Sequence, residues 1–250
     1  NAAPLGIGVA GTSGKSTPTG MIGWILHRAG MDPTVMNGAV MKNFVSPEAL
    51  FASALVGAGE AFVSELDESD GSIALFRPRI AVLNNISLDH KTMDELRRLF
   101  GDFVAKAETA VLNLDNDETA RIVSRTPGAI TYSLTDETAR LVAQDIRPER
   151  YGVSFAASDR ATGAASRVDL KMPGRHNVSN ALAAIGACLA CGVTLEEAAR
   201  ALGDFAGVRR RMELVGEAGG VTGTHGFGHN PDKNAPTPRT PHGFPGRPPV

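Results

Sequence analysis

The chain has 250 residues, of which 42% are hydrophobic and 21% charged, and its formal net charge at pH 7 is -2. Such a composition is typical of a soluble globular protein and excludes a basic surface for nucleic acid. The longest nearly apolar stretch, Ala181–Cys191, is too short to span a bilayer, and no signal peptide is recognised before Leu5. We therefore expect a cytoplasmic protein that binds neither nucleic acid nor membrane.

The first predicted element is a strand over residues 5–10, an apolar run that ends at a glycine turn. An amphipathic helix follows, because apolar residues recur at spacings of three and four between Met21 and Leu26. The turn between strand and helix reads Gly11-Thr12-Ser13-Gly14-Lys15-Ser16-Thr17.

This turn has the features of a phosphate site. Glycines let backbone N–H groups converge on an anion, the helix start adds partial positive charge, and Lys15 neutralises phosphate charge. Ser16 is positioned to bind Mg²⁺ through its hydroxyl. The usual pattern has a glycine where this chain has Val9, so a glycine turn with a chance lysine is the alternative. The flanking strand and helix favour binding of a nucleoside triphosphate.

Carboxylates follow a later predicted strand. After a short strand at residues 33–36 and a predicted helix at residues 47–56, the strand 61–63 runs into Ser64-Glu65-Leu66-Asp67-Glu68-Ser69-Asp70. Parallel sheets bind ligands at the carboxyl ends of their strands, so one of these carboxylates is a candidate Mg²⁺ ligand. The residues alone leave a solvated acidic turn equally open.

Polar residues also follow the apolar strand predicted at residues 80–83. Asn84 and Asn85 come directly after it, and Asp89 and His90 stand a few residues further on. For a single histidine such as His90, the residues favour a surface position over a functional one.

The middle of the chain alternates between the two kinds of element. Helices are predicted at 93–106 and 117–123, and strands at 110–112 and 129–132. Three further short strands, at 141–146, 151–155 and 168–171, indicate an antiparallel addition to a mostly parallel sheet. The predicted fold class is α/β, with a P-loop-type sheet flanked by helices.

Two helices and an irregular tail complete the prediction. The helices cover residues 178–191 and 195–202, the second capped by Thr194. Cys188 and Cys191 lie in the first of them without partner ligands, which favours core packing over a metal or redox role. Seven prolines among residues 231–250 predict irregular chain.

Four separated motifs resemble those of the Mur ligase family, ATP-dependent enzymes that add amino acids to the peptidoglycan precursor. The motifs are Gly11–Thr17, Ser64–Asp70, Asn85–His90 and Gly174–Ala184. The acidic motif is most similar to that of the branch that attaches L-alanine to UDP-N-acetylmuramate. Arg210–Glu213 resembles the hinge into the family's C-terminal domain.

The resemblance implies roles at the phosphates and the metal. The loop Gly11–Thr17, with Lys15, would bind the phosphates of ATP. Ser16 and Glu65 would hold one Mg²⁺ and His90 a second. Lys15, Glu65 and His90 would then be the catalytic residues.

The resemblance also implies roles at the two substrates. Asn37 and His90 would face the acceptor carboxylate, which belongs to a nucleotide sugar or a peptide. Asn177 and Asn180 would contact the adenine, and Arg211 the nucleotide. The acceptor carboxylate would form an acyl phosphate, from which an amino acid displaces phosphate to give an amide.

The same resemblance divides the chain into domains. Residues 1–208 would be the central ATP-binding domain, and residues 209–250 a truncated, Pro/Gly-rich start of the C-terminal domain. The missing N- and C-terminal domains of the ligase would be its partners, so the isolated piece is not expected to ligate unaided. Two alternatives stay open: a related ligase with another acceptor, such as a recycled muropeptide or a polymer, and a nucleotide-binding module.

Overall fold

The computed structural model describes residues 4–69, 71–209, 213–218 and 221–225. Ten strands form the main sheet. They are β1 (Leu5–Ala10), β2 (Thr34–Met36), β3 (Ala54–Leu55), β4 (Ala61–Glu65), β5 (Ile80–Leu83), β6 (Thr109–Asn113), β7 (Ile130–Ser133), β8 (Leu141–Glu149), β9 (Gly152–Asp159) and β10 (Ala164–Leu170).

The order of the strands is β10-β9-β8-β7-β6-β5-β1-β4-β2-β3. All pairs from β8 through β7, β6, β5, β1 and β4 to β2 are parallel, whereas β9, β10 and β3 pair antiparallel with their neighbours. The predicted α/β fold, a mostly parallel sheet with an antiparallel addition, is therefore confirmed. β8, β9 and β10 run longer than predicted. The added parts of β8 and β10 are mostly exposed and give no apolar signal, whereas the added part of β9 consists of small and polar residues that are buried or half-buried.

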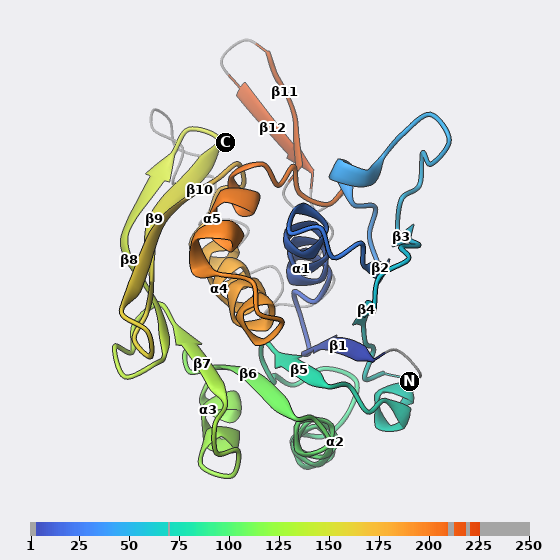
Figure 1. Ribbon diagram of the computed structural model, residues 1–250, viewed down its shortest axis with the longest axis vertical. Helices are drawn as coiled ribbons and strands as arrows, with labels where there is room; N and C mark the ends of the chain where they lie inside the picture. The colour runs from blue at the N-terminus through green and yellow to red at the C-terminus, as the bar shows by residue number, and fades with distance from the viewer. Residues whose placement is uncertain (1–3, 70, 210–212, 219–220, 226–250) are drawn as a thin grey trace.

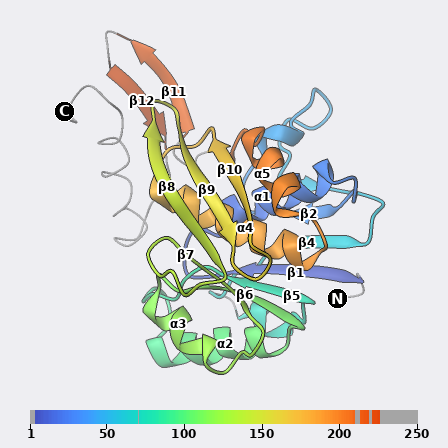
Figure 2. The same cartoon turned by 60° about the vertical axis from the view of Figure 1, so that its left-hand side comes forward.

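Helices cover both faces of the sheet. They are α1 (Ser16–Arg28), α2 (Met93–Ala105), α3 (Asp117–Val123), α4 (Arg175–Ala190) and α5 (Leu195–Gly203), with short 3₁₀ turns η1 (Lys42–Phe44) and η2 (Ser72–Leu75). The sheet curves around α1, α4 and α5, while α2 and α3 lie on its outer face (Figure 1). A hairpin of β11 (Glu213–Ala218) and β12 (Val221–His225) projects from this body (Figure 2).

The core consists of two apolar clusters, one on each face of the sheet. Ile25 of α1 and Leu182 of α4 belong to the cluster on the concave face, and both are fully buried. The outer cluster contains Leu96, Phe100 and Phe103 of α2. Full burial of a side chain such as Phe100 stabilises the fold by roughly 1.5–3 kcal/mol relative to exposure. Cys188 is also buried in the concave cluster, as its predicted packing role requires.

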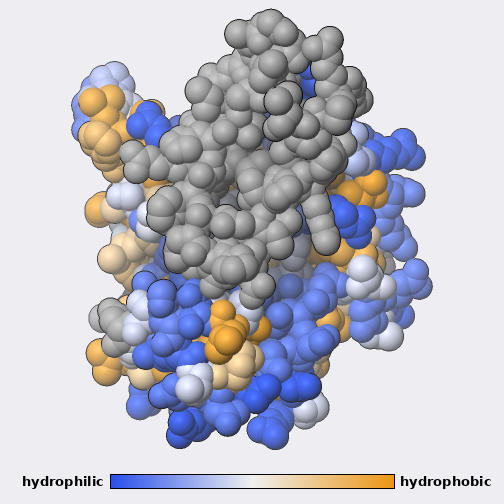
Figure 3. All heavy atoms as spheres, turned by 180° about the vertical axis from the view of Figure 1, so that it is seen from behind, coloured by the Kyte–Doolittle hydropathy of each residue, from blue (hydrophilic) through white to orange (hydrophobic). Residues whose placement is uncertain are grey.

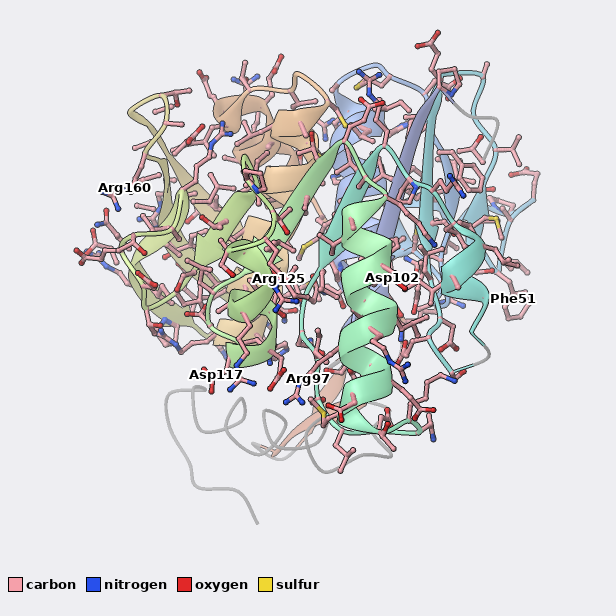
Figure 4. All side chains as sticks on the ribbon, turned by 90° about the horizontal axis from the view of Figure 1, so that it is seen from below. Phe51, Arg97, Asp102, Asp117, Arg125 and Arg160 are labelled. Carbon is pink, nitrogen blue, oxygen red and sulfur yellow. The ribbon has the colours of Figure 1, made fainter. Side chains whose placement is uncertain are left out.

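The outer layer is polar toward solvent. Seen from behind, the lower part of the described surface is mostly hydrophilic, with a small apolar cluster near its middle (Figure 3). Arg97 of α2 reaches α3, where its guanidinium binds both carboxylate oxygens of Glu118 at 2.7 and 2.8 Å (Figure 4). α2 is thus amphipathic, with one face on the sheet and one in solvent. α4 is apolar nearly all round, because it packs against α1, α5 and several strands.

The helix predicted at residues 47–56 is wrong. This segment contains β3, which pairs with β2 through Val35 and Leu55. The apolar residues that suggested a helix share no buried face, since Phe51 is 79% and Val56 88% exposed. Phe51 lies at the rim of the molecule (Figure 4). Edge pairing with β2, rather than helix packing, fixes this stretch.

Among the described residues, no helix is both long and apolar enough to cross a bilayer. The proline-rich stretch at residues 231–250 lies outside the described residues.

Candidate functional site

The predicted phosphate loop connects β1 to α1. Gly11 has φ +140° and Gly14 has φ +73°, conformations that residues with a Cβ rarely adopt. Two sharp turns therefore fit between the strand and the helix, and Ser16 becomes the first residue of α1. The 13-residue helix directs the positive end of its dipole at this loop.

The segment after β5 fastens the loop. The Ser13 N–H donates to Oδ1 of Asn85 at 3.0 Å, and Nδ2 of Asn85 donates to the Ser13 carbonyl at 2.9 Å. Thr12 and Ser87 form a second reciprocal pair, in which Oγ1 of Thr12 donates to the Ser87 carbonyl at 3.1 Å and accepts from the Ser87 N–H at 3.0 Å. The conformation of the loop is thus imposed from a neighbouring strand end.

Lys15 is held close to the loop. Its Nζ donates to the Gly11 carbonyl at 3.0 Å and forms an ion pair with Glu68 at 2.7 Å. The Lys15 and Glu68 side chains are only 13% and 6% exposed. Loss of either partner would leave a largely buried charge alone, which is strongly destabilising. Glu68 belongs to the predicted acidic segment, but the sequence did not single it out as the partner of the lysine.

Ser16, Glu65 and Asn37 come together beside the loop. Oγ of Ser16 donates to Oε1 of Glu65 at 3.1 Å. The other Glu65 oxygen accepts from the Gly38 N–H at 2.7 Å, and Nδ2 of Asn37 donates to the Ser16 carbonyl at 3.0 Å. A hydroxyl and a carboxylate oxygen are hard ligands, and Mg²⁺ takes the rest of its shell from water and phosphate. The donor set of Ser16 and Glu65 fits this ion.

His90 is largely exposed, and its described partner is not a member of this group. It follows the same loop that carries Asn85, but its side chain is 63% exposed and its Nε2 pairs with Asp89 at 3.4 Å. Within the described part of the chain, no three His, Cys, Asp or Glu side chains gather around a common metal position. Any metal site at Ser16 and Glu65 would therefore depend on few protein ligands.

Asn177 and Asn180 occupy the first turns of α4. Nδ2 of Asn177 donates to the Pro173 carbonyl at 2.8 Å, and its Oδ1 accepts from Nδ2 of Asn180 at 3.3 Å. Asn177 is buried, whereas Oδ1 of Asn180 lies 3.9 Å from the position a Cβ on Gly14 would take. The start of α4 therefore adjoins the phosphate loop. Arg211, the remaining predicted nucleotide contact, lies outside the described residues.

Sequence reasoning missed the contacts that hold the site together. The role of Asn85 as the clamp on Ser13 and the pairing of Glu68 with Lys15 both join residues far apart in the chain. One signal was present: polar residues follow β4 and β5, which flank β1 on its two sides. In a parallel sheet those strand ends meet at one edge.

A parallel sheet whose central strand runs through a glycine–lysine loop into a helix defines an α/β domain of the P-loop type. Residues 9–188 match the Mur ligase middle domain family. This match covers most of the chain, and the chain therefore belongs to the Mur ligase family.

Curated relatives agree with this assignment. The chain is 36% identical over 233 residues to the UDP-N-acetylmuramate–L-alanine ligase of Geobacter sp. (strain M21), covering 90% of the chain and 49% of the relative. It is 38% identical over 247 residues to the ligase of the same name from Magnetococcus marinus, covering 93% and 50%. The chain thus spans about half the length of these relatives.

Solved structures share the fold. The UDP-N-acetylmuramate–alanine ligase of Thermotoga maritima superposes with a TM-score of 0.82 at 24% identity, covering 97% of this chain and 55% of that one. A murein peptide ligase from Psychrobacter arcticus gives a TM-score of 0.73 at 30% identity, covering 93% and 53%.

Proposed function

We propose that this chain is the central, ATP-binding part of a ligase that joins the carboxylate of UDP-N-acetylmuramate to an amino acid in peptidoglycan precursor synthesis. The observation that carries the proposal is the meeting of Lys15, Ser16 and Glu65 around the start of α1. Membership of the Mur ligase family and the names of the relatives support it. A cytoplasmic location is part of the same proposal.

In this proposal the loop and Lys15 bind the phosphates of ATP. Backbone N–H groups at the start of a helix and a lysine ammonium both favour phosphate oxygens. Asn180, beside Gly14, and Asn177 would contact the adenine, and Arg211 would contact the nucleotide. The phosphates and the base would then lie along one line, from the start of α1 to the start of α4.

Ser16 and Glu65 would hold a Mg²⁺ ion, whose preferred ligands they supply. When bound, this ion neutralises negative charge that develops on the transferring phosphoryl group. We also propose that His90 binds a second Mg²⁺ and contacts the acceptor. These two roles rest on the family resemblance alone, because the described ion pair of His90 is with Asp89.

The proposed reaction has two steps. An oxygen of the acceptor carboxylate attacks the γ-phosphorus in line, the bond to the leaving ADP oxygen breaks, and an acyl phosphate forms. The amine nitrogen then attacks the acyl carbon, loses a proton and displaces inorganic phosphate. Lys15 balances charge in the first step, and Asn37, which contacts the Ser16 carbonyl, would face the acceptor.

The rest of the ligase would supply the other substrate contacts. Residues 1–208 are proposed as the central domain and residues 209–250 as the start of the next. The N- and C-terminal domains would bind the UDP group and the incoming amine. We therefore do not expect the chain by itself to complete the reaction.

The branch that uses L-alanine is favoured by the acidic motif and by the two curated relatives. A second candidate is a ligase that attaches a peptide, favoured by the 30% identity to the murein peptide ligase. Offering L-alanine and the tripeptide L-alanyl-γ-D-glutamyl-meso-diaminopimelate separately to the intact gene product, with UDP-N-acetylmuramate and ATP, distinguishes the two.

Isotope transfer tests the reaction class. With the intact gene product and UDP-N-acetylmuramate labelled with ¹⁸O in its carboxylate, a ligase moves one label into inorganic phosphate for each amide formed. ATP hydrolysis that leaves the phosphate unlabelled would reject the ligase and favour a nucleotide-binding module. Titration of the chain itself with Mg·ATP tests the nucleotide site separately.

A further inference from the structure

Asn84 lies directly beneath the phosphate loop and has no role in the proposed chemistry. It follows β5 and is only 4% exposed. Its backbone N–H donates to the Ala10 carbonyl at 3.1 Å, and its own carbonyl accepts from Nδ2 of Asn113 at 2.9 Å. These two bonds fix its backbone between the ends of β1 and β6.

The side chain of Asn84 connects the loop to a buried tyrosine. Nδ2 of Asn84 donates to the Gly14 carbonyl at 3.2 Å. Oδ1 of Asn84 accepts from the hydroxyl of Tyr132 on β7 at 3.3 Å. Because the hydroxyl donates to Oδ1, the amide is oriented with its N–H groups toward Gly14.

The environment of Tyr132 keeps its hydroxyl in place as the donor to Asn84. It is 1% exposed and packs in the concave core cluster beneath α4. Burial raises the pKa of its hydroxyl well above the usual value and the charge of Asp115 adds to this, while a hydrogen bond with Ser179 of α4 acts in the opposite direction. The hydroxyl therefore remains a neutral hydrogen-bond donor across the physiological pH range.

The bond to Gly14 determines which way one peptide group of the loop points. The described residues have no cis peptide bond, and in a trans peptide the C=O and the following N–H point in opposite directions. Since the Gly14 carbonyl is directed at buried Asn84, the Lys15 N–H is directed away from the interior. That is the side from which an anion can approach the loop.

We propose that Asn84 and Tyr132 are positioning residues that orient the Gly14–Lys15 peptide toward the phosphates of the nucleotide. The inference rests on the proposed function, because it assumes that the loop binds a nucleoside triphosphate. It adds two residues that touch no substrate and act through Gly14.

Two near-isosteric variants test the inference in the chain as it stands. Asn84→Asp keeps the acceptor for Tyr132 but turns a second acceptor toward the Gly14 carbonyl. Tyr132→Phe keeps the ring and removes the hydroxyl. We expect the affinity for a non-hydrolysable ATP analogue with Mg²⁺, measured by calorimetry, to fall about tenfold in Asn84→Asp and by about threefold in Tyr132→Phe.

The loss of affinity should be confined to ligands that carry the phosphates. The affinity for inorganic triphosphate should fall by the same factors, and the affinity for adenosine should not change. A defect that is only structural would lower the midpoint of thermal unfolding and weaken adenosine and triphosphate alike, and this result would overturn the inference.

Matched controls exist for both variants. Asn43 in η1 also donates through Nδ2 to a backbone carbonyl, that of Asp204, at 2.9 Å, and Tyr151 is the second tyrosine of the chain. Asn43→Asp and Tyr151→Phe should leave the affinity for the analogue unchanged. If Asn84→Asp does not fold, Tyr132→Phe alone decides.

The failures can be told apart. An unmodified chain that binds neither the ATP analogue nor triphosphate would overturn the proposed function and this inference with it. Normal binding by the unmodified chain, with equal affinity in both variants, would overturn the inference alone.

Discussion

The phosphate-loop region and the antiparallel strands β8–β10 belong to one sheet but are held together differently. Around the loop, side chains bind backbone groups of distant segments, as Asn85 does with Ser13 and Glu65 with Gly38. β8–β10 are joined by backbone pairing along most of their length, with a register shift in β8 between Gln144 and Arg147 and a charged contact between Arg140 and Asp159 at one end. The first arrangement depends on the identity of single residues, whereas the second depends mainly on extended backbone. Substitutions should therefore change ligand binding in the first region and only stability in the second.

Lys15→Ala should give the largest effect. A hydrogen bond to a charged group contributes about 1.5–3 kcal/mol, so affinity for Mg·ATP should fall by roughly 10- to 150-fold. Calorimetry with the unmodified chain as reference measures the change. Equal affinity would reject the assignment of this loop to the phosphates.

The loss of Lys15 also leaves the Glu68 carboxylate without its ion pair. The double variant Lys15→Ala/Glu68→Gln removes that buried charge and serves as the control. It should recover the unfolding midpoint that the single variant loses, but not the affinity for Mg·ATP.

Asp159→Asn should give the next effect, in the second region. Asp159 is 2% exposed and accepts from Nε and Nη2 of Arg140 at 2.9 and 3.0 Å. We expect the free energy of unfolding to fall by about 2 kcal/mol, measured by urea denaturation. Affinity for Mg·ATP should stay the same, and a large change in affinity would break the comparison between the two regions.

Asn85→Ala should weaken the affinity for Mg·ATP by about tenfold, because both of its hydrogen bonds to the Ser13 backbone are lost and the loop is less firmly held. Asn43→Ala is the matched control. Asn43 also makes two bonds to backbone groups, those of Asp204 and Ala206. If Asn43→Ala lowered the affinity as much as Asn85→Ala, the effect would not be specific to the contact between Asn85 and the phosphate loop.

The pH dependence of stability should give the smallest effect. Hydrogen bonds from the Arg140 guanidinium hold the pKa of Asp159 below its usual value. A carboxyl whose pKa is lowered by folding stabilises the fold above its unfolded pKa of about 3.9, and this contribution is lost as the pH falls through the lower, folded value. The urea midpoints of the unmodified chain and Asp159→Asn should therefore converge below pH of about 4, and a constant difference would contradict this cause.

The sequence predicted the two regions unequally. Apolar periodicity located β1, β5, α1 and α2, because a core-facing element must repeat its apolar residues. It failed at residues 47–56, where Phe51 and Val56, which flank the short edge strand β3, have the spacing of apolar helix residues but are exposed. It also shortened β8, whose outer half has no buried face.

At the site, residue types indicated the chemistry but not the partners. The spacing of Gly14, Lys15 and Ser16 predicted a phosphate loop, and the carboxylates after β4 predicted a metal ligand. The contact of Asn84 with Gly14 depends on β5 lying next to β1, which only the folded sheet defines. Periodicity carries no information on the order of strands in a sheet.

β1 precedes both of its neighbouring strands in the sequence and lies inside the sheet, where Leu5 pairs with Ala61 on one edge and Ile7 with Ile80 on the other. During synthesis, this strand must therefore wait until Leu83 has left the ribosome before both of its edges can be paired. Closing loops of this length slows folding. Until Asn85 and Ser87 arrive, the glycine turn after β1 has none of its fastening bonds, so the nascent chain acquires this turn only after several later elements have been made.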